Sequence, residues 1–136
     1  MSGSSILQYR FGNSEALSQA VNARRQTTIR QLSLNPLQCD LLLIESKPIT
    51  FTFTATSCPL HVMGAKGEGC LEFSFILQLG QQDFFAYGQA LPQTTLFGFD
   101  PTREVNLIVA GNSILCVTQI QRSNCKFNAR RAFQPL

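Results

Sequence analysis

The chain has 136 residues and a formal net charge of +3, and 44% of its residues are apolar. That apolar content excludes a wholly disordered chain, and the length fits a single domain, residues 1–136, that can bury roughly two-thirds of its unfolded surface. No apolar run approaches the ~18 residues of a transmembrane helix. The first residues lack the basic and apolar regions of a secretion signal, so we expect no signal peptide.

The first 30 residues are predicted to form an N-terminal arm followed by the only helix. Residues 1–12 begin with small polar side chains and end with apolar ones, as expected for an extended arm. Residues 14–25 favour a helix, because Asn13 or Ser14 can cap its start and Leu17 and Val21 lie on one face at helical spacing.

From about residue 36 onward the pattern changes to that of β-strands. Turn signals recur every 8–12 residues, which is typical of an antiparallel sandwich or barrel. Two hairpins are expected, one between residues 71–79 and 84–91 and one across Gly111 and Asn112. The predicted fold is therefore mainly β, an antiparallel β-sandwich or barrel of about seven to eight strands with one N-terminal helix. The expected strands cover residues 38–45, 49–55, 60–63, 71–79, 84–91, 94–99, 104–110 and 113–121.

Strict alternation in several of these strands predicts which face is buried. In residues 49–55, Phe51 and Phe53 lie on one face and threonines on the other. Because apolar side chains favour the interior, we expect the phenylalanine face to point into the core. The predicted core consists of Leu41, Leu43, Phe51, Phe53, Leu71, Phe73, Phe75, Leu77, Leu107, Val109, Leu115 and Val117.

The five cysteines are odd in number and irregularly spaced, which argues against a disulfide framework and favours buried thiols in a reducing compartment. Cys58 and His61 are the only cysteine and histidine close in sequence. Zinc sites usually need a second close pair of ligands, which the chain lacks, and no nucleophile turn of the GxSxG type is present. We therefore expect no metal site, no cofactor and no catalytic activity.

The charges are unevenly distributed along the chain. Residues 1–30 carry +3, residues 31–121 carry −4 and the C-terminal tail, residues 122–136, carries +4. Eight of the eleven basic residues are arginine, which is enriched at protein interfaces, whereas lysine is depleted there. Polar ends that decorate an ordinary β body would explain this layout, and so would basic ends that pack against the acidic body of another copy or that bind phosphate. The predicted interface residues are Arg10, Arg24, Arg25, Arg30, Arg122, Lys126, Arg130 and Arg131.

An alternative function follows from a resemblance. Residues 69–91, with Arg24, Arg25 and Arg30 upstream, resemble a PilZ domain, a small β-barrel that binds cyclic di-GMP. The resemblance implies a ligand-binding regulatory barrel in which these arginines contact phosphate. The chain departs from the family's pattern, because Arg25 and Arg30 are one residue too far apart for its RxxxR arm and no DxSxxG motif follows.

The main functional hypothesis is a non-enzymatic structural protein that self-assembles or docks in a larger particle. Its most specific form is a virion component: a phage capsid-decorating, head–tail connecting or tail protein. Strands rich in Gln, Thr and Phe, few lysines and no catalytic set motivate it. The expected partners are copies of itself or other structural proteins. We expect no contact with a membrane. Nucleic acid is a lesser alternative partner, which the basic ends would bind. The expected location is the virion, assembled in a reducing cytoplasm.

Overall fold

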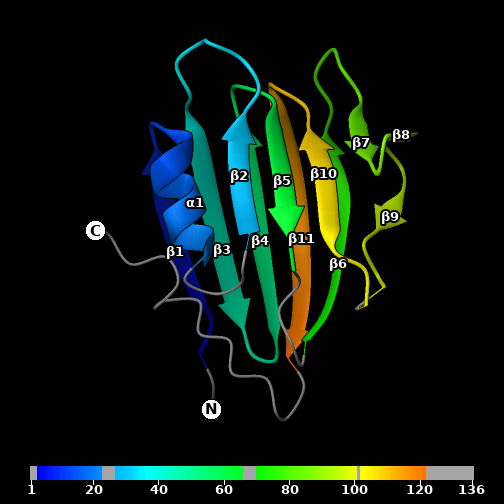
Figure 1. The fold of residues 1–136 in the computed structure, drawn as a ribbon. Helices are drawn as coiled ribbons and strands as arrows, with labels where there is room; N and C mark the ends of the chain where they lie inside the picture. Colours follow the sequence, from blue (N-terminus) through cyan, green and yellow to red (C-terminus); the bar gives the residue numbers. More distant parts are fainter. Residues whose placement is uncertain (1–2, 23–26, 66–69, 101, 122–136) are drawn as a thin grey trace.

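The computed structural model describes residues 3–22, 27–65, 70–100 and 102–121. These residues form two antiparallel sheets that face each other, with one short helix near the N-terminus (Figure 1). The predicted mainly β, sandwich-like fold is confirmed. The described residues form eleven strands rather than seven to eight, because the N-terminal arm is itself a strand, residues 27–31 form another, and residues 84–91 are divided into two.

The two layers are sheets of six and five strands. We call the six-stranded sheet the large sheet; its strand order is β1-β3-β4-β11-β6-β9. We call the five-stranded sheet the small sheet; its order is β2-β5-β10-β7-β8. The large sheet contains β1 (Ser5–Phe11), β3 (Cys39–Ser46), β4 (Ile49–Thr56), β6 (Cys70–Gln78), β9 (Leu96–Phe97) and β11 (Ser113–Gln121). The small sheet contains β2 (Thr27–Gln31), β5 (Leu60–Gly64), β7 (Phe84–Ala86), β8 (Gln89–Leu91) and β10 (Val105–Val109).

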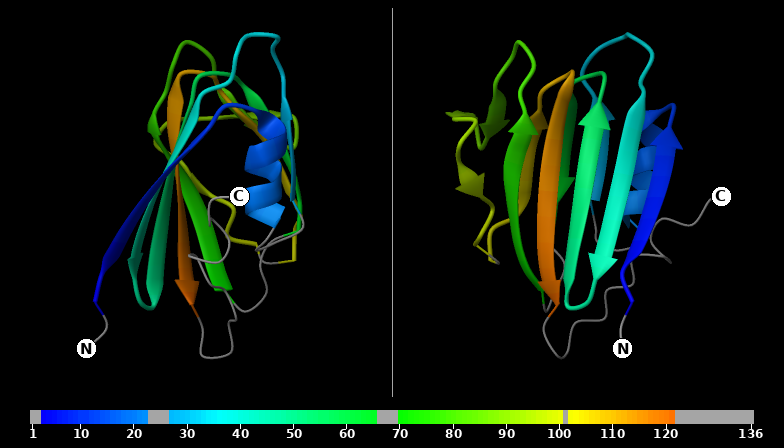
Figure 2. Two further views of the ribbon diagram at one scale, coloured as in Figure 1. Left: turned by 90° about the vertical axis from the view of Figure 1, so that its left-hand side faces the viewer. Right: turned by 180° about the vertical axis from the view of Figure 1, so that it is seen from behind.

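The helix α1 (Ser14–Asn22) extends the layer of the small sheet beside β2, as the side view in Figure 2 shows. The Asn13 side chain caps it by accepting a hydrogen bond from the backbone N–H of Ala16 at 2.8 Å. Leu17 is buried against the core, and the Ser18 hydroxyl accepts a hydrogen bond from the backbone N–H of Ile29 at 3.2 Å. The helix thus covers inner large-sheet surface that β2 does not reach.

Both predicted hairpins are wrong, because each pair of segments is divided between the two sheets. Residues 84–91 do not pair with β6; they form β7 and β8 of the small sheet, joined at Tyr87 and Gly88, whose φ angles of 52° and 79° suit a tight turn. The turn at Gly111 and Asn112 leads from β10 in the small sheet to β11 in the large one. The strand β2 was not predicted.

The core lies between the sheets, and its composition differs from the prediction on one side. Leu41, Leu43, Leu107, Val109 and Leu115 are buried there as predicted, and Val117 packs half-buried against them. The other half of the predicted core is wrong. The side chains that lie on the opposite, outward face of the large sheet are Phe51, Phe53, Leu71, Phe73, Phe75 and Leu77.

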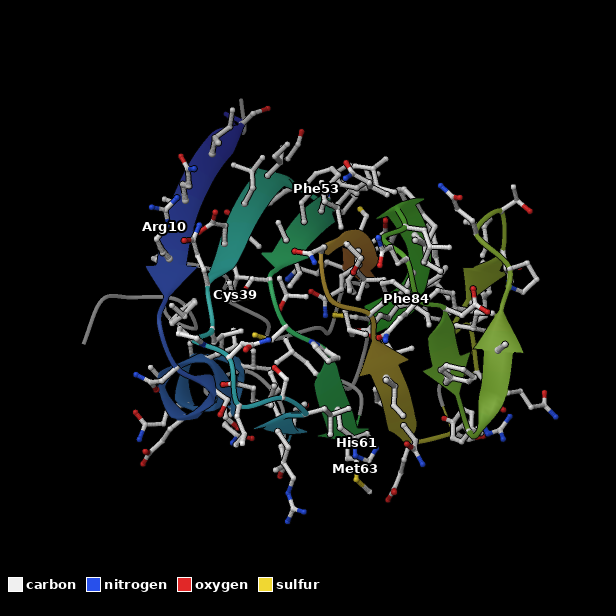
Figure 3. All side chains as sticks on the ribbon, turned by 90° about the horizontal axis from the view of Figure 1, so that it is seen from above. Arg10, Cys39, Phe53, His61, Met63 and Phe84 are labelled. Carbon is white, nitrogen blue, oxygen red and sulfur yellow. The ribbon has the colours of Figure 1, made fainter. Side chains whose placement is uncertain are left out.

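Threonine, serine and glutamate occupy the inward positions of β4 and β6 instead. Thr50, Thr52 and Thr56 are buried on β4, as are Glu72 and Ser74 on β6. In Figure 3, Phe53 points away from the small sheet, whereas Phe84 lies between the two layers. The large sheet is therefore apolar on its outer face as well as packed on its inner face.

The cysteine prediction is confirmed in part. Cys39, Cys58 and Cys116 are free and buried. Cys70, at the start of β6, is disulfide-bonded, so the prediction of a buried thiol is wrong for this residue. Cys125 lies outside the described residues.

Candidate functional site

The outer face of the large sheet is the first candidate site. We define the outer face as the outward-pointing side chains of β1, β3, β4, β11 and β6 with the adjoining Leu96 and Phe99. Several members are well exposed: Ile6 at 69%, Leu96 at 55%, Leu77 at 52% and Phe99 at 47% of their surface. Its apolar members are Ile6, Leu42, Ile44, Ile49, Phe51, Phe53, Ala55, Leu71, Phe73, Phe75, Leu77, Leu96, Phe99, Ile114, Cys116 and Ile120.

Four phenylalanines cover the middle of this face on both sides of β11. Cys116 pairs in register with Phe53 on β4 and Phe75 on β6, and Thr118 pairs with Phe51 and Phe73. The Cys116 and Thr118 side chains are consequently buried although they point outward. Burial raises the pKa of the Cys116 thiol. At the centre of the outer face, the four phenylalanines therefore shield Cys116 and Thr118 from solvent.

The rings on this surface are ordered by contacts with one another. Phe51 and Phe53 stack with their ring centroids 6.5 Å apart, and Phe73 stacks on Phe99 at 5.0 Å. Aromatic pairs at such separations add to the stabilisation that comes from buried area alone. Ring stacking within one chain thus orders part of the outer face.

Charge is almost absent from the outer face among the described residues. Alternation places only Arg10 and Asp40 there, next to each other on the edge strands β1 and β3. The Arg10 Nε donates to Asp40 Oδ1 at 2.7 Å, and Nη2 donates to Oδ2 at 3.3 Å. The hydrogen bond from Arg10 lowers the pKa of Asp40. Since the two charges neutralise each other, the described part of this face has no net charge.

The second candidate site is a cavity of about 490 Å³ between the two sheets. Apolar side chains of both sheets and of α1 form most of its wall, including Leu17, Val62 and Leu107. Thr52 and Ser74 contribute hydroxyl groups from the large sheet. The cavity lies where the predicted core would have placed phenylalanine side chains, and its volume is within the range of about 300–1,000 Å³ that is usual for ligand pockets.

Two polar features mark the wall of this cavity. Thr52 is 6% exposed, and its Oγ1 has no hydrogen-bond partner. Glu72 is also buried and accepts a hydrogen bond from Gln119 Nε2 at 3.0 Å. An unpaired buried hydroxyl costs about 1–3 kcal/mol, so Thr52 marks a place where a further polar partner is favourable.

Arg103 and Tyr87 are both part of the cavity wall. The guanidinium carbon of Arg103 lies 3.5 Å from the centroid of the Tyr87 ring, which is a cation–π arrangement. Both side chains are exposed. Among the described residues no carboxylate lies within ion-pairing distance of Arg103, so no described neighbour neutralises its charge.

Only two of the eight predicted interface residues fall in the described chain. Arg10 is bound to Asp40 of the same chain, on the outer face. Arg30 is exposed on β2, opposite His61 of β5, and does not line the cavity. Their contacts with another copy stay predictions. The remaining six lie outside the described residues: Arg24, Arg25, Arg122, Lys126, Arg130 and Arg131.

Cys58 and His61 have separate surroundings. The Cys58 Sγ is buried, 3.5 Å from the carbonyl oxygens of Asn35 and Pro36. His61 points outward from the small sheet (Figure 3), and its Nε2 is hydrogen-bonded to Asn106 Oδ1 at 2.9 Å. No group of three or more metal-ligating side chains occurs within residues 3–22, 27–65, 70–100 and 102–121.

Sequence reasoning missed both candidate sites. The alternating phenylalanines of the strands could have predicted the outer face, but they were assigned to the core. The threonines that alternate with them could have predicted the cavity, because small side chains that point inward leave space. A scan against family models gave no match, and searches of curated proteins and solved structures also gave none. In the described part of the chain no helix is long and apolar enough to cross a bilayer.

Proposed function

We propose that the protein is a non-enzymatic structural protein that assembles with copies of itself through the outer face of the large sheet. The single observation that carries the proposal is the sidedness of this sheet. Its inner face is already packed against the small sheet and α1, yet its outer face holds the phenylalanines of β4 and β6. Exposed apolar patches much larger than a few hundred Å² are rare on monomers and mark interaction sites.

A second copy of the chain is the occupant that fits this face best. Five strands about 4.8 Å apart and about 8 residues long present roughly 650 Å² in projection. A stable interface covers about 800 Å² of accessible surface on each partner, which is of the same order. The described face is neutral overall, because Arg10 and Asp40 pair with each other. A neutral, apolar, flat surface is complementary to itself, as a two-fold interface requires.

The particular form of this proposal is a virion component, such as a phage capsid-decorating, head–tail connecting or tail protein. Its support is compositional: few lysines, neutral polar strand residues and basic ends. In this form the arginines of both ends would contact neighbouring subunits in the particle. The size of the assembly separates it from a plain dimer, since a particle component forms larger arrays.

Sedimentation velocity of the full chain across a wide concentration range tests the proposal. We expect a species of two or more copies that dissociates on dilution. Phe53→Asp places a charge at the centre of the outer face. Central aromatic residues of interfaces contribute at least about 2 kcal/mol, which corresponds to about a 30-fold weaker association.

Met63→Asp is the matched control, because Met63 is an exposed apolar residue on the outward side of the small sheet (Figure 3). We expect this variant to associate like the unmodified chain. A monomeric chain at all concentrations would refute the proposal. Equal effects of the two substitutions would also refute it, because they would show that the outer face has no special role.

A further inference from the structure

We infer that the cavity between the sheets binds one small amphipathic carboxylate, of the class of medium-chain fatty acids, with its carboxylate at Arg103 and its apolar body between the sheets. This inference concerns the interior of the molecule and does not depend on assembly through the outer face. It rests on the cavity, on the exposed Arg103 and Tyr87 in its wall, and on the unpartnered hydroxyl of Thr52.

The volume of the cavity is the first step. Protein interiors are packed as densely as organic crystals, with few voids larger than one water molecule. A space of about 490 Å³ in a two-layer domain of this size is far larger than such voids. It arises because β4 and β6 direct threonine and serine inward and phenylalanine outward. Filling it with an apolar body restores the contacts that the inward phenylalanines would have made.

The side chains of the cavity wall indicate which kind of ligand fits. Most of the lining is aliphatic, from α1 and both sheets, which favours a hydrocarbon chain. The Thr52 Oγ1 is buried, lacks a partner and belongs to the cavity wall. Because polar groups in a cavity are normally hydrogen-bonded, Thr52 has capacity to donate to an oxygen atom of the ligand or to a water molecule carried with it.

The charges set the direction in which such a ligand enters. Arg103 lies on the cavity wall, stacked on Tyr87, and no described carboxylate is within ion-pairing distance of it. Arginine binds carboxylates through two parallel hydrogen bonds, which are stronger than those between neutral groups. Glu72 lines the cavity from β6 of the large sheet and is acidic, so its side chain offers a ligand carboxylate no positive charge. The anionic head is therefore expected at Arg103.

Equilibrium titration of the full chain with dodecanoate and with dodecanol tests this inference. We expect dodecanoate to bind saturably with one molecule per chain and at least tenfold more tightly than dodecanol. Arg103→Gln removes the cation from an exposed position. It should lower the affinity for dodecanoate to that for dodecanol and leave dodecanol binding unchanged, which also shows that the variant is folded.

Two further variants locate the ligand. Ser74→Leu reduces the cavity volume and should weaken both ligands, whereas Phe53→Asp alters only the outer face and should weaken neither. Absence of saturable dodecanoate binding would overturn the inference. Binding that is insensitive to Arg103→Gln, or that is lost in Phe53→Asp, would also overturn it, the latter by placing the amphiphile on the outer face. A monomeric chain that binds dodecanoate as expected would refute self-assembly and leave this inference intact.

Discussion

The two faces of β4 and β6 in the large sheet differ in a way that is opposite to the usual arrangement. Their inward positions include threonines, a serine and a glutamate, while their phenylalanines point away from the rest of the chain. In ordinary antiparallel sheets with one solvated face, the apolar side chains point to the core. Coverage of the outer face by a second copy, as proposed above, would account for this difference.

The inward threonines of β4 still border an apolar core, because β3 and the small sheet supply the apolar side chains around them. In the register between β3 and β4, Leu41 and Leu43 lie beside Thr54 and Thr52. The small sheet adds Leu107, and its Phe84 is fully buried. The threonines therefore contribute modest area and leave the cavity, whereas the phenylalanines remain available for contact outside.

The sharpest comparison of the two faces uses adjacent residues of β3. Leu43 points inward and is 1% exposed, and Ile44 points outward. We expect Leu43→Ala to lower the free energy of unfolding by about 2–5 kcal/mol, as for other buried leucines. Ile44→Ala should cost clearly less in urea denaturation of the dissociated chain. Its cost should grow with protein concentration, because the outer face is covered only on association.

The cost of Leu43→Ala should not depend on protein concentration. If both substitutions cost the same in dilute solution, the two faces of β3 are equally buried within one chain. In that case the outer face is not the free surface that the comparison describes.

The next effect concerns the thiol of Cys39, which is fully buried on the inner face near Asp40. Burial raises its pKa to about 12. Above its unfolded pKa of about 8.5, the unfolded chain loses the thiol proton while the folded chain keeps it. The contribution to stability is thus fully present below that pKa and is lost as the pH rises towards 12.

Urea denaturation at pH 8 and pH 10 measures this effect. Stability should fall by on the order of 1–2 kcal/mol more in the unmodified chain than in Cys39→Ala, which lacks the thiol and serves as the control. Equal slopes against pH in the two proteins would show that Cys39 titrates alike in both states.

Much of the fold could be predicted from the sequence, because strand alternation and turn residues are local signals. The strands around Phe51, Phe73 and Leu107 were found within one or two residues of their observed ends. What local signals lack is the partner of each strand. Gly111 and Asn112 have the residues of a hairpin turn, yet they connect the two sheets, because β11 pairs with β4 and β6 instead of β10.

The candidate site was harder to predict for a related reason. A period of two separates Phe53 from Thr52, but it does not tell which of the two faces the second sheet. Assigning the more apolar set to the core assumes that the chain is covered only by itself. The assignment is wrong for the phenylalanines of β4 and β6, which lie on the outer face. The cavity beside Thr52 was not predicted for the same reason.

A smaller effect compares two buried threonines of the large sheet. Thr52 points inward with an unpartnered Oγ1, while Thr118 points outward with its Oγ1 4.0 Å from Cys116 Sγ. Thr52→Val removes an unsatisfied hydroxyl and keeps the shape, so we expect it to raise the ligand-free melting temperature by a few degrees. Thr118→Val should leave it unchanged or lower it. A destabilised Thr52→Val variant would show that its hydroxyl is satisfied in solution.

The smallest expected effect lies at the edge of the outer face, where Arg10 and Asp40 pair across β1 and β3. Both groups are largely solvated, and exposed ion pairs contribute little to stability, so Arg10→Gln should barely change the melting temperature at neutral pH. The hydrogen bond from Arg10 holds the Asp40 pKa below its ordinary value. Its small contribution is therefore present above the unfolded pKa of about 3.9 and is lost as the pH falls through the folded one. A carboxyl NMR titration should find the Asp40 pKa higher in Arg10→Gln.

The salt dependence of the Arg10–Asp40 pair compares associated and dissociated protein. If association through the outer face partly desolvates the pair, added salt should reduce the stability difference between the unmodified chain and Arg10→Gln. This reduction should be smaller in the associated protein than in a Phe53→Asp background, because solvent and ions screen exposed pairs most strongly.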